Sequence, residues 1–576
     1  MHRPPAPFPK HLRTLSAIAF LGIGACSQGE PEEGPYVRDI LQADGVARSV
    51  GKEIEAELLH GVVAGETELA LESLAEDFHG HFPRRDAGRT VANDGLDLRL
   101  YGKEDMLELG REEFAALLGE HVAGWESAGR LAFESERFYL SETGDRAHGV
   151  GEIRVAGQTT DGGRVDVHVE GDFELVLQPD LGWQLTRFEG HDGTRVEGGP
   201  PPFVEVSAAL GFHFNESPTN RAMMQAAIDE HRTLALGGLT ALDWNRDGFW
   251  DLIGTTTRQQ SVLFLNDGVG GFVRKELPVK EPHDCSNFML WFDLDGDGLE
   301  ELVGSQPIAY EGDRARLGIY TRRDGEWVLL DRALEFPNPV GRRHVAMPTI
   351  VPCDVDGDGL VDLIAGTYGD AKSRGEDFNT VLAHDGGDNH LFMNRGGLEF
   401  SEESEARGIH GTQYTFVVQP FDFDGDGDTD LFEGNDFGPN VLWVNDGTGH
   451  FRADRESILS GESAYTMGVT LADYDNTGQW SMYIANMFSE AGNRIASLAD
   501  GLSDEMRAKM FTIASGNMLY AQGKDGGWSE RGHALHCNKG EWAWGTNFCD
   551  LDNDGDRDLI VTNGFTSHSQ EELPDW

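Results

Sequence analysis

Residues 354–362, DVDGDGLVD, decide how the second half of this 576-residue chain folds. The same pattern, an acidic loop that leads into an apolar stretch, occurs six times, with first residues Asp243, Asp293, Asp354, Asp422, Asp473 and Asp550. We number these loops 1 to 6 in chain order and count positions within each loop from its first aspartate. The loop starts lie 50 to 77 residues apart, which leaves room for about four short strands in each repeat.

A hairpin with glycine and an aromatic residue separates successive loops. These hairpins are LFLNDGVGGF ending at Phe272, IYTRRDGEW ending at Trp327, LFMNRGGLEF ending at Phe400, VLWVNDGTGHF ending at Phe451 and LYAQGKDGGW ending at Trp528. Repeats that cannot bury their apolar faces alone must stack or close radially. A β-propeller meets this requirement, because closure leaves only short, protected strand edges. We therefore expect a mainly β fold in this half of the chain.

The loops carry oxygen side chains at positions 1, 3, 5 and 9, with glycine at position 6 in every copy. The predicted metal ligands are Asp243, Asn245, Asp247 and Asp251; Asp293, Asp295, Asp297 and Glu301; Asp354, Asp356, Asp358 and Asp362; Asp422, Asp424, Asp426 and Asp430; Asp473 and Asp475; and Asp550, Asp552, Asp554 and Asp558. Hard oxygen ligands without His or Cys select Ca²⁺, with Mg²⁺ second. Two carboxylates about 4 Å apart repel by roughly 4 kcal/mol at an effective dielectric near 20. We expect up to six calcium ions, each a folding component of its repeat.

An EF-hand is excluded, because it needs a bidentate glutamate at position 12 and flanking helices. Position 12 is Gly254, Gly304, Ala365, Ile484 or Val561 in five loops. Loop 4 has Glu433 there, which we interpret as a chance acid, with an extra ligand as the alternative. Loop 5 has only two carboxylates at ligand positions, because Thr477 and Ser481 replace the others. Solvated acidic turns without metal are the alternative reading of all six loops.

These loops and hairpins resemble FG-GAP/VCBS repeats, which form the calcium-bearing propellers of integrin α heads and of many exported bacterial proteins. Residues 466–494 and 544–564 resemble the cartilage-acidic-protein relatives with ASPIC/UnbV tails. The resemblance covers residues 203–576 and implies a propeller of seven blades, with six as the alternative. Those relatives continue beyond the point that corresponds to Trp576. FVEVSAALG, residues 203–211, resembles the last strand of a repeat, so we expect it to close the ring.

Residues 36–192 have the pattern of a small α+β domain. Phe114, Leu117, Leu118, Val122 and Trp125 share a helical face, and Val165, Val167 and Val169 alternate with polar residues as in a strand. A Pro-Asp-Leu-Gly turn at residues 179–182 predicts a hairpin. Helices followed by a strand meander resemble the SnoaL-like, nuclear-transport-factor-like cone fold. Such folds hold a pocket, which Asp77, His79 and His81 would line; an incidental cluster is the alternative. Residues 193–202 are predicted as a linker.

The N-terminus has the pattern of an export signal. Arg3, Lys10 and Arg13 precede an apolar run at residues 15–25, which is too short to span a bilayer. The run ends in Ile-Gly-Ala-Cys, which resembles a bacterial lipobox with Cys26 as the lipidated residue. Residues 1–25 would then be a lipoprotein signal peptide and residues 26–35 a tether, with Ser27 favouring the outer membrane of the cell envelope. A cleaved signal peptide without lipidation is the alternative.

The net charge of the chain and the absence of several catalytic motifs narrow the possible ligands and enzyme classes. With 100 Asp and Glu against 46 Lys and Arg, the net charge of −54 disfavours nucleic acid and anionic lipid as partners. The sequence contains no Gly-x-Ser-x-Gly elbow, P-loop or dinucleotide-binding fingerprint. We expect a binding or adhesion module for protein or glycan, more plausibly than an enzyme. One alternative is a calcium-dependent polysaccharide lyase or other envelope enzyme. Its catalytic residues would have to include a basic cluster, and Arg342, Arg343 and His344 form the one compact basic group in the sequence. A second alternative is an activity in the pocket of the first domain.

Two insertions, residues 367–389 and 488–517, interrupt the repeats. The second predicts a helix with Leu502, Met506 and Met510 on one face, and we expect it to be a flap that covers the rim of the propeller. A binding surface formed by insertions on one face is the alternative. His410 and Tyr414, and the pair Trp542 and Trp544, precede acidic loops. Core packing is the expectation for these four residues, and the lining of a central channel is the alternative.

Overall fold

The computed structural model describes residues 35–93, 96–199, 206–212, 222, 237–256, 259–277, 279, 289–304, 309–338, 347–368, 386–461, 465–488, 493 and 503–563. The predicted signal peptide, Cys26, the basic group at residues 342–344, residues 203–205 and most of both insertions lie outside the described residues. The chain clusters into two compact units, one dominated by residues 25–204 and one by residues 205–488 and 512–566. In the described part of the chain, every helix is too short or too polar to cross a membrane.

The first unit packs helices against a twisted sheet. Its helices are α2 (Pro35–Ile54), η1 (Glu55–Leu59), α3 (His60–Ala64), α4 (Thr67–Glu72), η2 (Lys103–Asp105) and α5 (Arg111–Val122). Its strands are β1 (Leu74–Pro83), β2 (Arg89–Asn93), β3 (Leu96–Tyr101), β4 (Met106–Gly110), β5 (Trp125–Leu140), β6 (Arg146–Thr159), β7 (Arg164–Gln178) and β8 (Gly182–Gly198). The strand order is β2-β3-β8-β7-β6-β5, with β1 parallel to β8 and antiparallel to β4.

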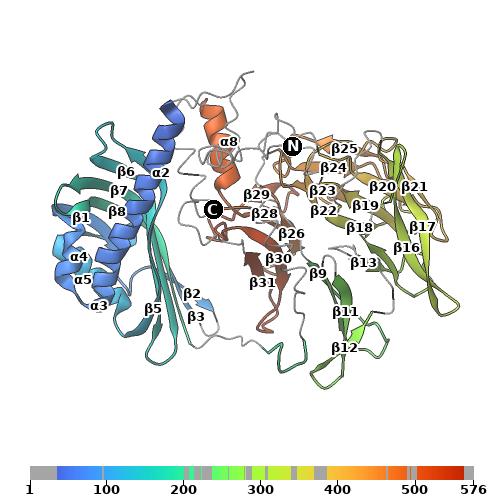
Figure 1. Ribbon diagram of the computed structural model, residues 1–576, viewed down its shortest axis with the longest axis horizontal. Helices are drawn as coiled ribbons and strands as arrows, with labels where there is room; N and C mark the ends of the chain where they lie inside the picture. The colour runs from blue at the N-terminus through green and yellow to red at the C-terminus, as the bar shows by residue number, and fades with distance from the viewer. Residues whose placement is uncertain are drawn as a thin grey trace, which may run out of the picture. The chain divides into compact units, whose positions relative to one another are not determined.

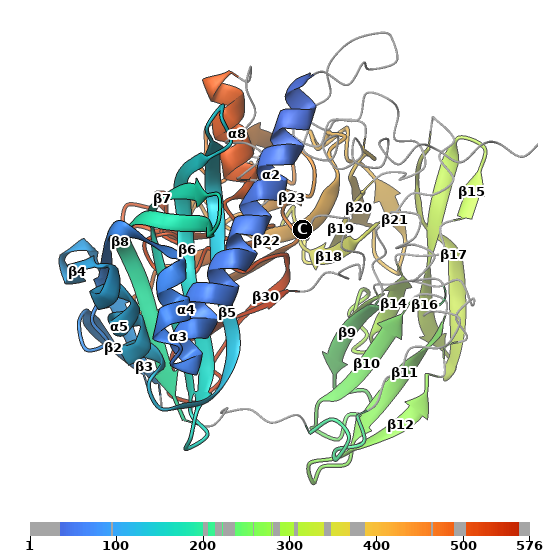
Figure 2. The ribbon, with the colours of Figure 1, turned by 60° about the vertical axis from the view of Figure 1, so that its left-hand side comes forward.

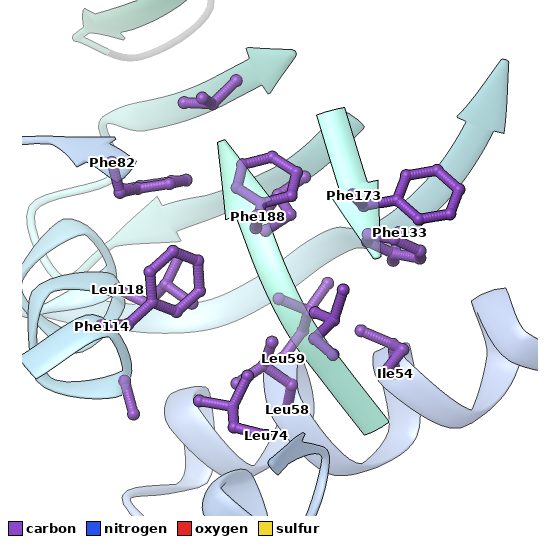
Figure 3. Close-up of a cluster of buried hydrophobic side chains, with 14 of the residues drawn as sticks. Ile54, Leu58, Leu59, Leu74, Phe82, Phe114, Leu118, Phe133, Phe173 and Phe188 are labelled. Carbon is purple, nitrogen blue, oxygen red and sulfur yellow. The ribbon is translucent and has the colours of Figure 1, made fainter. Parts of the chain in front are cut away.

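The core of this unit lies between the helices and the sheet. Ile54, Leu58 and Leu59 from the helical layer meet Phe133, Phe173 and Phe188 from the strands (Figure 3). Val165, Val167 and Val169 are buried, as their alternation predicts, and β7 turns into β8 at the predicted hairpin. Trp125 does not belong to the helical face. The helix ends at Val122, because Ala123 is extended and Gly124 is left-handed, and Trp125 begins β5.

The first unit extends further than the sequence predicts. Strand β8 continues to Gly198, inside the predicted linker 193–202, and Glu197 pairs with Asp97 of β3 and Val165 of β7. The Glu197 carboxylate also accepts hydrogen bonds from Arg195 and Arg85. These contacts hold the end of the strand in the sheet although the following residues are rich in glycine and proline.

The second unit contains six antiparallel sheets among its described strands (Figures 1 and 2). Sheet 1 has β9 (Gly237–Leu242), β10 (Asp251–Thr256), β11 (Gln259–Asn266) and β12 (Phe272–Glu276); sheet 2 has β13 (Met289–Phe292), β14 (Glu301–Gly304), β15 (Ala309–Glu311), β16 (Arg314–Arg323) and β17 (Glu326–Pro337); sheet 3 has β18 (Thr349–Cys353), β19 (Asp362–Gly366), β20 (His390–Asn394) and β21 (Phe400–Glu402); sheet 4 has β22 (Thr415–Phe421), β23 (Asp430–Asn435), β24 (Val441–Asn445) and β25 (Phe451–Asp454); sheet 5 has β26 (Gly468–Ala472), β27 (Ser481–Ala485), β28 (Met518–Gln522) and β29 (Trp528–Glu530); sheet 6 has β30 (Ala543–Cys549) and β31 (Asp558–Asn563). In each sheet, the acidic loop joins the first two strands.

Neighbouring sheets share their apolar cores. Ile364 and Leu391 of sheet 3 pack with Val418, Leu431 and Trp443 of sheet 4 in one buried cluster. The first strand of each sheet contacts the first strand of the next, from β9 through β30. The mainly β prediction is therefore confirmed. None of the described sheets closes on itself, so the propeller and its number of blades stay predictions.

Helix α8 (Asp504–Ala514) lies in the second insertion as predicted, and Met510 is buried, whereas Leu502 lies outside the described residues. The segment before sheet 1 differs from its sequence prediction. Residues 206–211 form a turn rather than a strand. The Leu210 amide donates to the Val206 carbonyl, and Gly211 adopts a left-handed conformation that ends the turn.

Candidate metal centres

The first and sixth residues of each loop fix its turn. One oxygen of the position 1 aspartate accepts a hydrogen bond from the amide of the position 6 glycine in all six loops, at 2.8 to 3.1 Å. All six glycines have a positive φ, between 77° and 99°. A side chain at position 6 would be strained in this conformation, so the recurring glycine is a backbone requirement.

The position 9 acid has a structural role that the sequence does not reveal. It is the first residue of the second strand, and one of its oxygens accepts the position 2 amide at 2.8 to 3.1 Å in loops 1, 2, 3, 4 and 6. In loops 1, 3 and 4, its other oxygen accepts the amide of an asparagine at the end of the third strand. Each oxygen keeps a lone pair for a metal, because a carboxylate offers about four acceptor sites.

Burial and repulsion from neighbouring carboxylates raise the pKa of the position 9 acid in loops 2, 3 and 4. Burial raises the pKa of Glu301 to about 7, and the nearby Asp295 and Asp297 add to the rise. Burial likewise raises the pKa of Asp362 and of Asp430 to about 6, with contributions from the other carboxylates of each loop. A divalent cation among these groups would relieve both causes, since it replaces lost hydration and cancels like-charge repulsion.

Four loops bring three carboxylates together. Oxygen atoms lie within 4.8 Å of one another among described residues in the sets Asp293, Asp295 and Asp297; Asp354, Asp356 and Asp362; Asp422, Asp424 and Asp430; and Asp550, Asp552 and Asp554. Within the described chain, loops 1 and 5 bring no such trio together: loop 1 has Asn245 at position 3, and loop 5 has two acids.

Loop 3 also contains a buried oxygen that lacks a partner. Asp356 Oδ1 is buried without a hydrogen bond, whereas Asp356 Oδ2 accepts from the Arg407 guanidinium at 3.3 Å. A buried carboxylate oxygen without a donor is costly. A cation bound by Asp354, Asp356 and Asp362 would satisfy this oxygen, so the residues present fit a hard divalent metal.

Glu433, the acid at position 12 of loop 4, is engaged elsewhere. Its side chain is buried, and its two oxygens accept from Trp443 Nε1 at 2.7 Å and from Asn435 Nδ2 at 3.1 Å. Burial raises the pKa of Glu433 above its ordinary value. These contacts tie β23 to β24, which gives Glu433 a structural role.

In the first unit, the predicted trio lies on one face of β1. Asp77 and His79 are exposed and His81 is half-buried, whereas Phe78 and Phe82, which alternate with them, are buried in the core. The trio therefore does not line the interior of this unit.

A buried polar cluster that the sequence does not indicate lies inside the first unit instead. His121 Nε2 donates to the Pro83 carbonyl at 2.9 Å, and Arg195, which is 1% exposed, approaches His121 Nδ1 at 3.4 Å and donates to Glu197 at 2.8 Å. Burial lowers the pKa of His121 to about 4, and burial raises the pKa of Tyr101 to about 12. These residues are far apart in the sequence, and none belongs to a recognisable motif.

The aromatic residues before loop 4 have different surroundings. Tyr414 is buried among Phe437, Tyr465 and Met487, as the core-packing expectation requires. His410 is exposed and contacts the edge of Trp443. Trp542 and Trp544 are half-buried.

Comparison with known proteins places repeats in the second unit. The model of the FG-GAP-like repeat family matches residues 243–304, 354–433 and 422–484. No curated protein matches the chain.

Solved structures match the N-terminal part of the chain. A conserved protein from Planctomyces limnophilus is 14% identical, with a TM-score of 0.18, and the match covers 26% of this chain and 97% of that one. The Δ5-3-ketosteroid isomerase from Mycobacterium sp. is 15% identical, with a TM-score of 0.16 and coverages of 25% and 91%. A nuclear transport factor 2-like protein from Salmonella enterica is 10% identical, with a TM-score of 0.17 and coverages of 28% and 95%.

Proposed function

We propose that this protein is an exported, calcium-stabilised β-propeller that binds a protein or a glycan, anchored to the cell envelope by a lipid on Cys26. The FG-GAP-like repeats and the six sheets support a propeller-like binding module. The apolar run before Cys26 supports export and anchoring, and the net charge of −54 argues against nucleic acid as the ligand. The mature chain would present the rim of the propeller to the outside of the envelope.

One observation carries the calcium assignment: three carboxylates come together in four loops, at positions 1, 3 and 5 of loops 2 and 6 and at positions 1, 3 and 9 of loops 3 and 4. In loop 3 this trio includes the buried, unpartnered Asp356 Oδ1. The ions would be held by positions 1, 3, 5 and 9 of loops 2, 3, 4 and 6, and more weakly by loops 1 and 5. Calcium suits these loops better than magnesium, because flexible loops with many oxygens do not impose the tight octahedral shell of magnesium.

A turn that occurs twice in the second unit with the same hydrogen bonds supports closure of the ring by the segment before sheet 1. In residues 206–212 the Phe212 amide donates to the Ser207 carbonyl, and the Leu210 carbonyl accepts the Phe272 amide at 2.7 Å. Residues 403–409 repeat this pattern, with Ile409 donating to Ser404 and Arg407 accepting from Phe451 at 2.7 Å. The second turn follows β21, the outer strand of sheet 3. We infer that residues 206–212 take the place beside sheet 1 that residues 403–409 take beside sheet 4, as closure of the ring by this segment requires.

A calcium titration by isothermal calorimetry on the full mature chain tests the metal assignment. We expect about four sites with dissociation constants of about 10⁻⁴–10⁻³ M, as in other extracellular calcium modules. Chelation with EGTA should lower the melting temperature. A protein that binds no calcium and melts identically with and without EGTA would contradict the assignment.

Ligand binding needs its own experiment. The calcium-loaded protein should retain a protein or a glycan on an envelope pull-down and a glycan array, and EGTA should abolish that retention. Turnover of a polysaccharide without any retained ligand would instead favour a calcium-dependent enzyme.

A further inference from the structure

One asparagine in sheet 4 contacts two successive acidic loops. The Asn445 amide donates to Asp430 Oδ1 of loop 4 at 2.8 Å, and Asn445 Nδ2 donates to the Thr429 carbonyl of loop 4 at 3.0 Å. The same Nδ2 also donates to the Val355 carbonyl of loop 3, at 2.8 Å. Asn445 is buried, so these contacts are shielded from water. It therefore joins its own loop to the loop of the preceding sheet.

Sheets 3 and 5 make the same backward contact. Asn394 donates through Nδ2 to the Leu294 carbonyl of loop 2 at 3.0 Å, as well as to the Val361 carbonyl of its own loop. In sheet 5 the residue that corresponds to Asn394 is Gln522. The donor in this sheet is instead Trp528 at the start of β29, whose Nε1 donates to the Phe423 carbonyl of loop 4 at 3.0 Å. Leu294, Val355 and Phe423 all occupy position 2. The next sheet thus holds the position 2 carbonyl in loops 2, 3 and 4.

This carbonyl lies beside the metal ligands. The peptide group that contains it continues into the position 3 aspartate, whose carboxylate is a predicted ligand, and the position 2 amide is held by the position 9 acid. Holding the position 2 residue through both its amide and its carbonyl orients the backbone that carries these ligands. A loop whose ligands are already oriented loses less conformational entropy when it binds a cation.

Loop 3 has a second contact with the following sheet. Arg407 donates to Asp356 Oδ2 at 3.3 Å and to the Thr448 carbonyl in the β24–β25 turn at 2.9 Å. The same turn approaches the loop closely, since a Cβ atom on Gly449 would lie 3.1 Å from the Cβ of Asp356. The position 3 ligand therefore lies directly against sheet 4.

We propose that cation binding by loops 2, 3 and 4 is coupled to docking of the sheet that follows each loop. The proposal rests on the calcium binding proposed above. Docking of the next sheet orients the loop and raises its affinity, and by linkage the bound cation strengthens the contact between the two sheets. Asn394, Asn445 and Trp528 are the positioning residues of this coupling.

Trp528→Phe tests the coupling, because it removes the donor to loop 4 and keeps an aromatic ring beside Phe423. Hydrogen–deuterium exchange of peptides covering each loop, measured across a calcium chloride titration, reports occupancy loop by loop. Loss of one buried hydrogen bond should move the midpoint for loop 4 to about threefold to tenfold higher calcium. The midpoints for loops 2 and 3 should not move.

Trp327→Phe is the matched control. Trp327 ends the corresponding hairpin of sheet 2, and within the described residues it contacts loop 1 by stacking its ring on Trp244, with the ring centroids 6.1 Å apart. The control should leave the midpoint of loop 1 unchanged. In the reciprocal experiment, Asp422→Asn in loop 4 should speed exchange in β29 of sheet 5 more than in β21 of sheet 3.

The outcomes separate the coupling from calcium binding itself. An unchanged loop 4 midpoint in Trp528→Phe, with calcium-dependent protection of loops 2, 3 and 4 intact, would overturn the coupling alone. If no loop of the unmodified protein gained protection with calcium, the metal assignment would fail instead.

Discussion

Asp354 and Gly359 show how two residues define an acidic turn. The aspartate accepts the glycine amide at 2.9 Å, and the glycine supplies the positive φ that brings the amide within reach. Both roles follow from residue type and spacing, so these positions are predictable from sequence. The role of Asp362 is only half predictable. Its acidity suggests a ligand, but its hydrogen bonds to Val355 and Asn394 depend on where the third strand lies.

The complete and incomplete loops should respond differently to the same substitution. Asp354→Asn removes a charged ligand from loop 3, whereas Asp473→Asn removes one from loop 5, which has only two acids. At 10 mM calcium, a site with a dissociation constant of 10⁻⁴–10⁻³ M contributes about 1.4 to 2.7 kcal/mol to the unfolding free energy. Asp354→Asn should lose about this much of the calcium-dependent stabilisation, measured by denaturation with calcium and with EGTA, and Asp473→Asn should lose less. Equal losses would contradict the ranking of the loops.

His121 makes the first unit sensitive to acid. Its pKa is about 4 in the fold and about 6.5 when the chain is unfolded, so between these values the unfolded state binds more protons. The stability from this residue is complete above pH 6.5 and is lost as the pH falls toward 4, by up to about 3 kcal/mol.

The pH dependence of unfolding, measured by hydrogen exchange of first-unit peptides, checks this prediction. His121→Gln should flatten the slope between pH 6.5 and 4, because glutamine does not titrate and still offers a donor to the Pro83 carbonyl. His79→Gln, at an exposed position of β1, is the control and should leave the slope unchanged. A slope that persists in His121→Gln would show that another group causes it.

At the scale of elements, an asparagine–threonine contact joins neighbouring sheets at the edge opposite the acidic loops. Asn389, just before β20, donates to Thr415 Oγ1 at the start of β22, and Asn440 donates to Thr466 before β26, at 2.9 and 3.0 Å. Each threonine lies seven residues before the first aspartate of the next loop. Sequence periodicity reveals the repeat, but it does not indicate that these polar residues are buried partners, because isolated Asn and Thr are ordinary loop residues.

Sheets 5 and 6 lack this contact, and restoring it should stabilise the chain. The corresponding asparagine, Asn517, has its Nδ2 buried without a hydrogen-bond partner, and Ala543 occupies the place of the threonine. Ala543→Ser supplies an oxygen there and should add about 0.5 to 1.5 kcal/mol to the unfolding free energy. Chemical denaturation at fixed calcium measures the change.

Thr466→Ala is the opposite experiment in sheets 4 and 5. It leaves Asn440 Nδ2 without its partner and should cost about 1 to 3 kcal/mol. If Ala543→Ser destabilised the chain while Thr466→Ala cost nothing, the contact would not be an inter-sheet element.

At the scale of the whole molecule, ring closure depends on whether sheet 6 meets sheet 1. Trp480 occupies position 8 of loop 5. Its ring packs against that of Phe421, the last residue before loop 4, with the ring centroids 5.0 Å apart. Loop 1 has Trp250 at the same position, and its side chain is 68% exposed, against 43% for Trp480. In a closed ring of six sheets, Trp250 would pack against the last residue before loop 6, which is Cys549, a free thiol. Because Trp480 packs against its neighbouring sheet, we expect the exposed Trp250 to lie in the interface between sheets 6 and 1.

A chemical cross-link tests this contact, because the partner thiol is native. Trp250→Cys, treated with a short bis-maleimide, should join residues 250 and 549 within one chain, and peptide mass analysis would separate this product from adducts of Cys285, Cys353 and Cys537. The pair Trp480→Cys and Phe421→Cys, introduced together, is the positive control, since those side chains are in contact. A six-sheet ring would be ruled out if the control pair were linked efficiently while Trp250→Cys gave only separate adducts at residues 250 and 549, with no link between them. Linkage would show that sheet 6 is the neighbour of sheet 1, because residues from opposite ends of the repeat array approach this closely only when the array closes.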